Sequence, residues 1–434
     1  MTTPSSEVLD GTTIGVTGSR RRWTVTAWGA VRPWDDDGAL GAGSVDWFVA
    51  ADDRWHTPAD ESTIRQRRVE GAPVLETRVR IPEGDAIQRV WAVTDHEGVV
   101  LVEFENASPL PIAVAVHGDH IVTERPPALV PVEGIELPDD TIVLPIGHHS
   151  TVRVALGATA SVPTGSPALT VARGWTRIVE QASRLVLPDP AVGESVTAAR
   201  CDLLLHGPVD VDDDPIGFLL DVGELVRCGD PAADWLVEMV EPAEHLAASG
   251  RRRRFGRGGA GGLDVEAHDA LVAVRRVAQA AGDERARDDV DRMLAKLPAP
   301  PDEPPVSLAD LRRGREGNTS VGRYVRRIER RLAAHGDLLP GGIPTGWLGA
   351  DFEVHGIPTA SDAAVGFAVR WHGERPAVLW EQLGAVQMLT ARSVDPEWST
   401  EAVSGEGLWA IPGNATLARR PISISIEGIS GAGE

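Results

Sequence analysis

The sequence predicts a multi-domain α+β protein, in which an N-terminal antiparallel β-sandwich precedes a central set of α-hairpins and a small C-terminal β unit. Three observations support this order. Apolar residues alternate with polar ones up to about residue 172, then recur at helical spacing, and alternate again from residue 338. The expected domains are residues 1–174, 175–336 and 337–434, since 434 residues exceed what one ordinary core accommodates.

A period of two predicts the strands of the N-terminal part. Residues 75–81 and 102–105 each alternate apolar side chains, or threonine, with charged ones. Such alternation is typical of strands that bury one face. Turn signals such as Pro-Glu-Gly-Asp at residues 82–85 separate these segments. Seven or more antiparallel strands with short connections indicate a large β-sandwich.

The central part repeats one helix signature. Asp-Pro pairs are each followed by a glycine, in the order 189–190 with Gly207, 214–215 with Gly229, and 230–231 with Gly250. Aspartate accepts the free amides at a helix start, proline suits the first helical position, and glycine tolerates the left-handed conformation that ends a helix.

Apolar spacing extends this helical series. Further helices are expected over residues 176–187, 264–281, 283–297 and 319–334, with the arginines of the last one facing water. Consecutive hairpins of this kind stack into a bundle or a partial α/α toroid, because about six helices are too few for a complete double ring.

The C-terminal part gathers aromatic, histidine, arginine and carboxylate side chains over residues 338–409. Strands are expected at residues 365–371, 377–380, 386–390, 407–411 and 421–426. Flat aromatic and guanidinium faces beside directional hydrogen-bonding groups suit a polar, ring-shaped ligand such as a sugar. The other interpretation is a compact β unit that locks the helices to the sandwich.

Seven residues of this stretch are candidates for a site. Glu381 and Glu406 are the candidate acids, and the candidate ligand-binding residues are Trp347, His372, Arg375, Asp395 and Trp398. Glu406 stands between two glycines, which allow a close approach to the backbone. Four of them have a structural alternative: Glu381 as an arginine partner between strands, Asp395 as the cap of a turn, and the two tryptophans as covers of a core edge.

Composition limits the partners. The net charge of -22 opposes nucleic acid and anionic membrane surfaces, and the basic run at residues 251–254 lies in a glycine-rich stretch expected to be a solvated loop. The first residues lack the features of a signal peptide, and no apolar run is long enough to span a bilayer. With two cysteines that lack a metal-ligand pattern, a cytoplasmic, reduced protein is expected.

Cofactors are not expected. The histidines at residues 117, 120, 148 and 149 do not supply three or four converging metal ligands. No glycine-rich phosphate loop opens a helix, and the chain's single lysine, Lys296, lies on a predicted helix surface, which argues against a pyridoxal or Schiff-base enzyme.

Several segments carry a family resemblance: residues 45–48 (Val-Asp-Trp-Phe), 54–56 (Arg-Trp-His), 102–114 and 367–381. The last two are similar to segments of uncharacterised actinobacterial glycosidase-like proteins. The order of domains across most of the chain resembles the glucoamylase and glycoside-phosphorylase group of six-hairpin glycosidases. The resemblance implies a carbohydrate-active protein that acts on or binds an α-glucan or related oligosaccharide, with inversion if it is hydrolytic.

The chain departs from that family at the reaction centre. Inverting glycosidases hold a general acid and a general base roughly 6.5 to 9.5 Å apart, and no helical residue here matches either. The acidic turn at residues 210–214 is a candidate, although Asp214 is favoured as a helix N-cap. The departure leaves an alternative: a non-catalytic binding or scaffold protein that retains a degenerate glycosidase-like fold.

Overall fold

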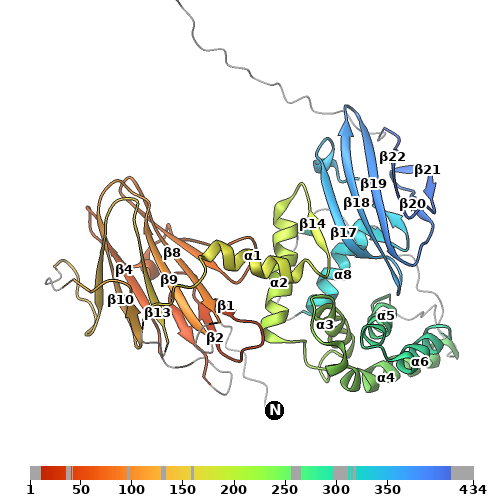
Figure 1. Ribbon diagram of the computed structural model, residues 1–434, viewed down its shortest axis with the longest axis horizontal. Coiled ribbons are helices and arrows are strands. Elements are labelled where there is room, and N and C mark those ends of the chain that lie inside the picture. The colour runs from red at the N-terminus through yellow and green to blue at the C-terminus, as the bar shows by residue number, and fades with distance from the viewer. Residues whose placement is uncertain are drawn as a thin grey trace, which may run out of the picture.

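The computed structural model describes residues 11–35, 41, 43–94, 98–128, 133–157, 161–255, 265–296, 311–312, 314–315 and 319–411. Within these ranges the chain forms seven α-helices and five sheets, and the sheets are mostly antiparallel. The mixed α+β class predicted from the sequence is confirmed. Figure 1 shows the N-terminal strands on one side and the helices and C-terminal strands on the other, with α1 and α2 between them.

The strands that precede the first α-helix form three sheets. They are β1 Thr12–Gly15, β2 Arg22–Val25, β3 Val31–Pro33, β4 Asp46–Ala50, β5 Trp55–His56, β6 Arg65–Arg68, β7 Leu75–Ile81, β8 Gly84–Val93, β9 Val99–Asn106, β10 Ile112–His117, β11 Ile121–Thr123, β12 Ile142–Ile146 and β13 Thr151–Leu156. A short 3-10 helix, η1, spans Pro58–Asp60.

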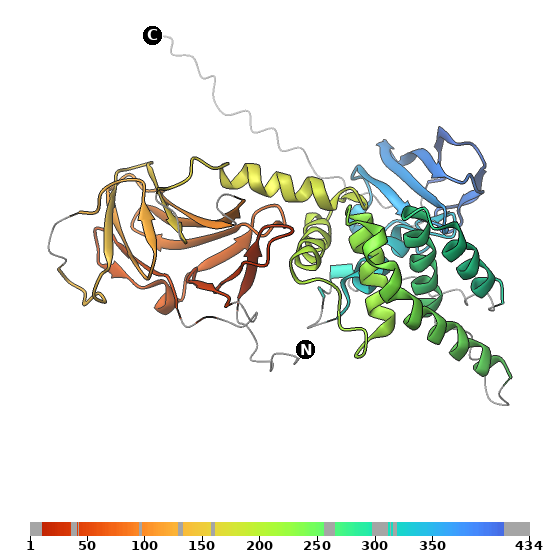
Figure 2. The same cartoon turned by 60° about the horizontal axis from the view of Figure 1, so that its bottom comes forward.

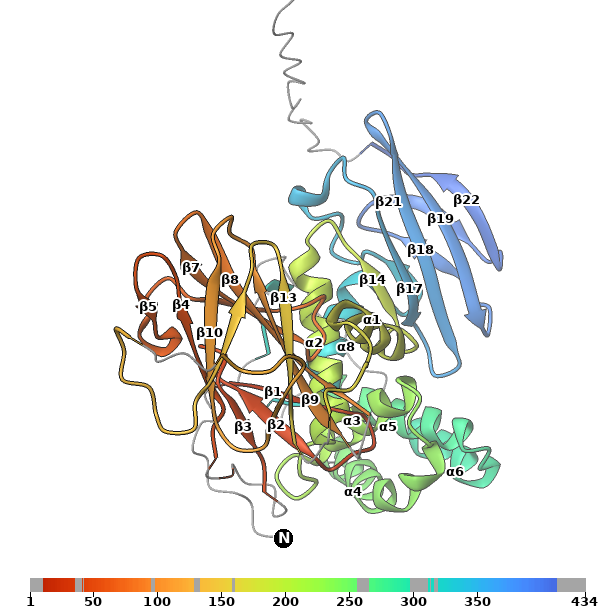
Figure 3. The ribbon, with the colours of Figure 1, turned by 60° about the vertical axis from the view of Figure 1, so that its left-hand side comes forward.

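The sheets have the orders β1-β2-β3, β12-β10-β4-β5 and β11-β13-β9-β8-β7-β6. All three bury apolar side chains in one shared core, to which Trp47 of β4, Val90 of β8 and Val154 of β13 contribute. The layers are seen side-on in Figure 2 and from another side in Figure 3. The period-two pattern of residues 75–81 and 102–105 is therefore a strand pattern, as predicted.

The helices are α1 Ala168–Val179, α2 Pro190–His206, α3 Pro215–Arg227, α4 Leu236–Phe255, α5 Val265–Ala280, α6 Glu284–Leu294 and α8 Val321–Leu332, with the 3-10 helices η3 Ala232–Asp234 and η4 Thr345–Trp347. The signature predicts the extents of α2 and α3, but the aspartate caps only α3, because the Asp189 carboxylate pairs with Arg312 and accepts no amide hydrogen bond at the start of α2. Asp189 precedes α2, which ends at Gly207 with φ 80°, and the Asp214 carboxylate accepts a 2.9 Å hydrogen bond from the Gly217 amide at the start of α3.

Two helix predictions are wrong. Helix α4 continues through Gly250 and includes the basic run at residues 251–254, because arginine is a good helix former and an isolated glycine is tolerated. The helix expected over residues 176–187 instead ends at Val179, and Arg184–Val186 forms strand β14. Strand β14 pairs with β17, so a partner far along the chain overrides the local helical spacing.

The C-terminal strands are β15 Ala333–Ala334, β16 Asp337–Leu338, β17 Phe352–Pro358, β18 Ala363–His372, β19 Arg375–Gly384, β20 Leu389–Ala391, β21 Asp395–Thr400 and β22 Ser404–Leu408. They form the sheets β14-β17-β18-β19-β22 and β15-β16-β20-β21. The strands expected at residues 365–371 and 377–380 are confirmed as β18 and β19. The strand expected at 421–426 lies outside the described residues.

Helix α8 packs between helices α2 and α3 and the C-terminal strands. Its apolar residues join a core shared with α2 and the C-terminal strands, including Val325, Ile328 and Leu332. The prediction that its arginines face water is wrong. Arg331 is buried, and Arg323 and Arg326 form ion pairs with Asp214 and Asp269 on neighbouring elements.

Among the described helices, none combines the length and the apolar character needed to cross a membrane.

Candidate ligand-binding site

The two acids predicted from the sequence lie near each other on an open sheet face. Glu381 of β19 is opposite Ser404 of β22, and Leu379 is opposite Glu406, so both carboxylates are on the same face of adjacent strands. Diagonal neighbours of this kind have Cα atoms roughly 7–8 Å apart. Both side chains are exposed, in the company of Leu379 and Leu408. The structure thus brings the acids together at the surface of the sheet.

His372 and Arg375 flank the two-residue turn of the β18–β19 hairpin, as expected, and are paired across it. The Arg375 Nε donates a 2.8 Å hydrogen bond to the carbonyl of Trp409. Arg375 and Glu381 are six residues apart on one strand, which is about 20 Å of extended chain. These residues therefore do not converge with the acids.

Asp395 stabilises a turn. Its carboxylate accepts hydrogen bonds from the amides of Glu397 at 3.2 Å and Ala410 at 2.8 Å. The structural alternative for this residue is confirmed.

Trp347 belongs to the core. It is 2% exposed and its ring centroid lies 5.3 Å from that of Phe352. The structure corrects its assignment as a stacking platform, because a ligand cannot reach a ring that is buried in the core.

Trp398 is partly buried between Trp380 and Trp409, with ring centroids 5.4 and 5.8 Å away in edge-to-face orientations. The glycines beside Glu406 serve this cluster. A Cβ atom at Gly405 would lie 2.6 Å from the Trp380 ring, and one at Gly407 would lie 3.1 Å from Trp398 Nε1. The close approach predicted for a ligand at these glycines is made by two tryptophan rings of the protein itself.

We expect Gly405→Val to destabilise the C-terminal β unit by about 2 kcal/mol, because the added side chain must displace the Trp380 ring. Thermal unfolding followed by tryptophan fluorescence measures the loss. Ser404→Val, at the exposed neighbouring position, is the matched control and should change stability by less than about 0.5 kcal/mol. Equal losses in the two variants would contradict the packing argument.

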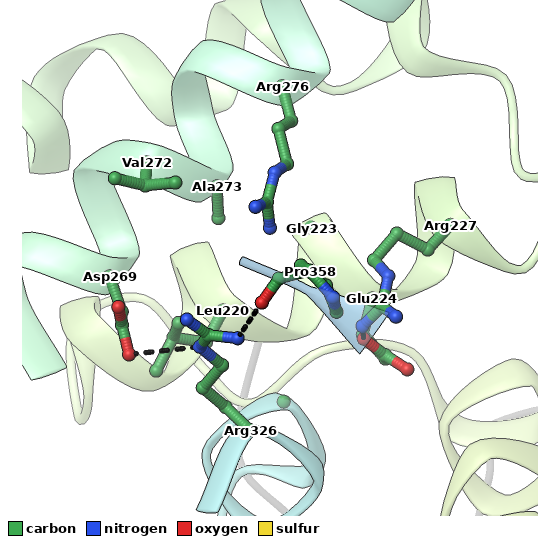
Figure 4. Close-up of a pocket in the computed structure, with 11 residues that line it drawn as sticks. Leu220, Gly223, Glu224, Arg227, Asp269, Val272, Ala273, Arg276, Arg326 and Pro358 are labelled. Atoms are coloured by element: carbon green, nitrogen blue, oxygen red, sulfur yellow. Dashed lines mark hydrogen bonds and ion pairs between the residues drawn. The ribbon is translucent and has the colours of Figure 1, made fainter. Parts of the chain in front are cut away.

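A small pocket of about 40 Å³ lies in the helical part, between α3, α5, α8 and the end of β17. Figure 4 shows the side chains that line it. Its charged lining consists of Glu224 and Arg227 from α3, Asp269 and Arg276 from α5, and Arg326 from α8. The net charge of the chain is -22, so the three guanidinium groups around this pocket place positive charge in a protein that is negative as a whole.

Glycines set the spacing of the helices around this pocket. A Cβ atom at Gly223 of α3 would lie 2.8 Å from the Ala273 Cβ of α5. A Cβ atom at Gly322 of α8 would lie 2.3 Å from the carbonyl oxygen of Leu220 on α3. The backbones therefore approach more closely than residues with side chains allow, which brings the arginines of three helices to one point.

Both acidic side chains of the pocket are paired with arginine. Glu224 contacts Arg227 and Arg200, each at 2.6 Å, and Asp269 contacts Arg326 at 3.2 Å. The Arg326 Nη1 also donates to the carbonyl of Pro358 at 2.9 Å, as Figure 4 shows.

Behind the pocket, Glu329 of α8 joins the same network. Its carboxylate, 0% exposed, contacts Arg227 at 2.8 Å and Arg200 at 3.2 Å, and accepts a 2.8 Å hydrogen bond from the Ser183 hydroxyl. Burial acts to raise the pKa of Glu329, but the charges of Arg227 and Arg200 outweigh it and lower the pKa to about 2. This carboxylate is held ionised and rigid.

Arg276 differs from the other arginines. Its guanidinium donates to the backbone carbonyls of Ser361, at 3.1 Å, and Ala360. Within the described part of the chain it has no carboxylate in ion-pair contact. Burial lowers the pKa of Arg276 to about 9, and the positive charges of Arg326 and Arg227 add to the effect. Arg276 therefore remains charged at neutral pH, but its charge is poorly compensated.

No metal site emerges: in the described ranges, no three histidine, cysteine or acidic residues form a group that could hold an ion. The two cysteines are free and buried beside the network. Burial raises the pKa of both thiols, that of Cys228 to about 12.

The thiols should be unreactive in the folded protein, because the thiolate is the nucleophile and a buried thiol with a raised pKa forms little of it. We expect a colorimetric disulfide reagent at pH 8 to modify neither Cys201 nor Cys228 within minutes, and to modify both in denaturant. Rapid reaction of the native protein would show that this region opens readily.

Sequence reasoning missed the pocket, although one signal was present. Glu329 follows Val325 by four residues and precedes Leu332 by three, so it falls on the apolar face of its predicted helix. A carboxylate on such a face is rarely buried unless it is paired. The arginines of the same helix were available as partners, but the sequence does not show which helices they meet.

No protein-family model matches this chain, and no curated protein is significantly similar to it.

Proposed function

We propose that the chain is a non-catalytic binding protein that retains a degenerate glycosidase-like arrangement: a β-sandwich, α-hairpins in a partial toroid and a small β unit. Its ligand is an α-glucan or a related oligosaccharide. The resemblance of residues 102–114 and 367–381 to glycosidase-like proteins supports this class. The buried free thiols support a reducing, cytoplasmic location.

One observation carries the non-catalytic assignment: both acids that line the pocket are bonded to arginine. A general acid or base has to change its protonation state in each catalytic cycle. An arginine within hydrogen-bond distance stabilises the ionised carboxylate and so opposes that change. The pocket can therefore hold a ligand more readily than it can transfer a proton.

A second candidate is an inverting glycoside hydrolase with Glu381 and Glu406 as its acids. The observation in its favour is their shared position on one face of β19 and β22. The Cα atoms of diagonal strand neighbours are roughly 7–8 Å apart, and the flexible glutamate side chains can place their carboxyl groups at the roughly 6.5 to 9.5 Å that inversion requires.

The test compares hydrolysis with binding over a panel of α- and β-glucans. Reducing-sugar release is measured for the wild type, Glu381→Gln and Glu406→Gln, and binding is measured for each by calorimetry. Binding without release supports the binding protein. Release that both substitutions abolish supports the hydrolase. Neither binding nor release with any glycan would refute both carbohydrate assignments.

A further inference from the structure

We propose that the arginine pocket binds the carboxylate group of a small organic monoacid, either free or as the acid group of a sugar acid. The pocket is the one lined by Arg227, Arg276 and Arg326. The inference rests on the proposed binding function and specifies the chemistry of the ligand at this position.

Unused hydrogen-bond donors face this ligand. Arg276 donates from Nε and Nη2 to backbone carbonyls, and within the described part of the chain no residue accepts from its Nη1. Arg326 uses Nε for Asp269 and Nη1 for Pro358, and no described residue accepts from its Nη2. Figure 4 shows both guanidinium groups extending from their helices into the pocket. A guanidinium with free N–H groups matches the two oxygens of a carboxylate.

Charge favours an anion over a neutral ligand. The pocket lining carries three arginines and two carboxylates, and the groups paired with them add Arg200, Arg330 and Glu329, so positive charge is in excess. The carboxylates Glu224 and Asp269 repel a ligand in proportion to its negative charge, so they oppose a phosphate dianion more strongly than a monoanion.

The rest of the lining suits a short carbon skeleton. Leu220, Val272, Ala273 and Pro358 supply apolar atoms. The volume of about 40 Å³ exceeds the 10–15 Å³ that one water needs, so a carboxylate with one or two carbons fits inside. A larger acid, such as a sugar acid, has to leave its ring outside the pocket.

The experiment is calorimetric titration and thermal unfolding with sodium acetate, D-glucuronate, D-glucose and inorganic phosphate, at one ionic strength set with sodium chloride. We expect acetate to bind, glucose not to bind at this pocket, and phosphate to bind more weakly than acetate. Glucuronate binding tighter than acetate would assign the acid to a sugar. Acetate binding tighter than glucuronate would assign it to a free small acid.

Arg276→Gln should weaken acetate binding by a factor on the order of 10 to 100, because it removes a charge-assisted pair. Arg276→Lys keeps the charge but lacks the fork of donors and should give an intermediate loss. Arg275→Gln is the matched control: the neighbouring arginine on α5 pairs with Asp291 at 2.5 Å and does not line the pocket. It should leave the affinity for acetate unchanged.

Three results would overturn the inference: no acetate or glucuronate binding, tighter binding of phosphate than of acetate, or equal losses in Arg276→Gln and Arg275→Gln. The results also distinguish a failure of this inference from a failure of the proposed carbohydrate-binding function. Neutral glucans that bind while both acids do not would refute only the carboxylate site, and acetate that binds while no glycan does would refute only the carbohydrate assignment.

Discussion

Replacing Glu329 with glutamine should lower the free energy of unfolding by about 3 kcal/mol, because it removes one of the two carboxylates that Arg200 and Arg227 share and leaves Glu224 alone to compensate both buried charges. Urea unfolding followed by tryptophan fluorescence measures the change. Glu353→Gln is the control, since Glu353 also contacts two arginines, at 2.6 and 3.1 Å, but is 23% exposed. Glu353→Gln should lower the free energy of unfolding by less than about 1 kcal/mol.

The carboxylate of Glu329 also makes the free energy of unfolding depend on pH. The pKa of Glu329 is about 2 in the folded protein, whereas a glutamate in an unfolded chain has its ordinary pKa of 4.5. The folded state therefore binds fewer protons, and the stabilisation is complete above pH 4.5 and is lost as the pH falls toward 2. We expect the wild type and Glu329→Gln to differ most at neutral pH and to converge toward pH 2. A difference that stays constant with pH would show that ionisation of Glu329 is not its cause.

Replacing Gly322 with valine should destabilise the protein by about 3 kcal/mol or more, because the new Cβ atom would lie 2.3 Å from the Leu220 carbonyl oxygen. Backbone atoms of a packed helix cannot move aside as a flexible side chain can. The two helices would have to separate, which also removes the 2.7 Å hydrogen bond from the Gly322 amide to Asp221. Differential scanning calorimetry measures the change.

Gly174→Val is the control that shows whether the destabilisation by Gly322→Val comes from the position of the residue or from replacing a helical glycine with valine. Gly174 lies on the exposed side of α1, and no atom would lie within 4 Å of an added Cβ. This variant should be as stable as the wild type or slightly more stable, since glycine is a poor helix former. Similar losses at residues 174 and 322 would contradict the close approach of α3 and α8 as the cause.

Local chemistry predicted most of the elements. Asp214 marks the start of α3 through a hydrogen bond to Gly217, three residues away, and Pro190 suits the start of α2. The alternation in residues 365–371 is likewise local, and Val365, Phe367 and Val369 are buried together as predicted. The local sequence predicts the wrong secondary structure where a distant segment determines it, as at Arg184–Val186, which pairs with β17.

The site could be predicted less well for the same reason. The side-chain chemistry and local neighbours of Trp347, Trp398 and Glu406 predict a site, but their surroundings depend on which strands become adjacent. The pocket draws on α3, α5 and α8, and Arg276 and Arg326 are recognisable as a pair only after these helices are packed. Glu329 was the exception, because its place on an apolar helical face is visible in the sequence.

The pairing of β14 with β17 also limits when the C-terminal sheet can be completed during synthesis. Arg184 of β14 contacts Glu353 of β17, and the two residues are 169 positions apart. At 5–20 residues per second, a ribosome needs about 8–34 s to synthesise that interval. During this time the nascent chain presents β14 without its partner, so the edge of the C-terminal sheet is completed late in translation. A chaperone that holds extended segments has this interval in which to act.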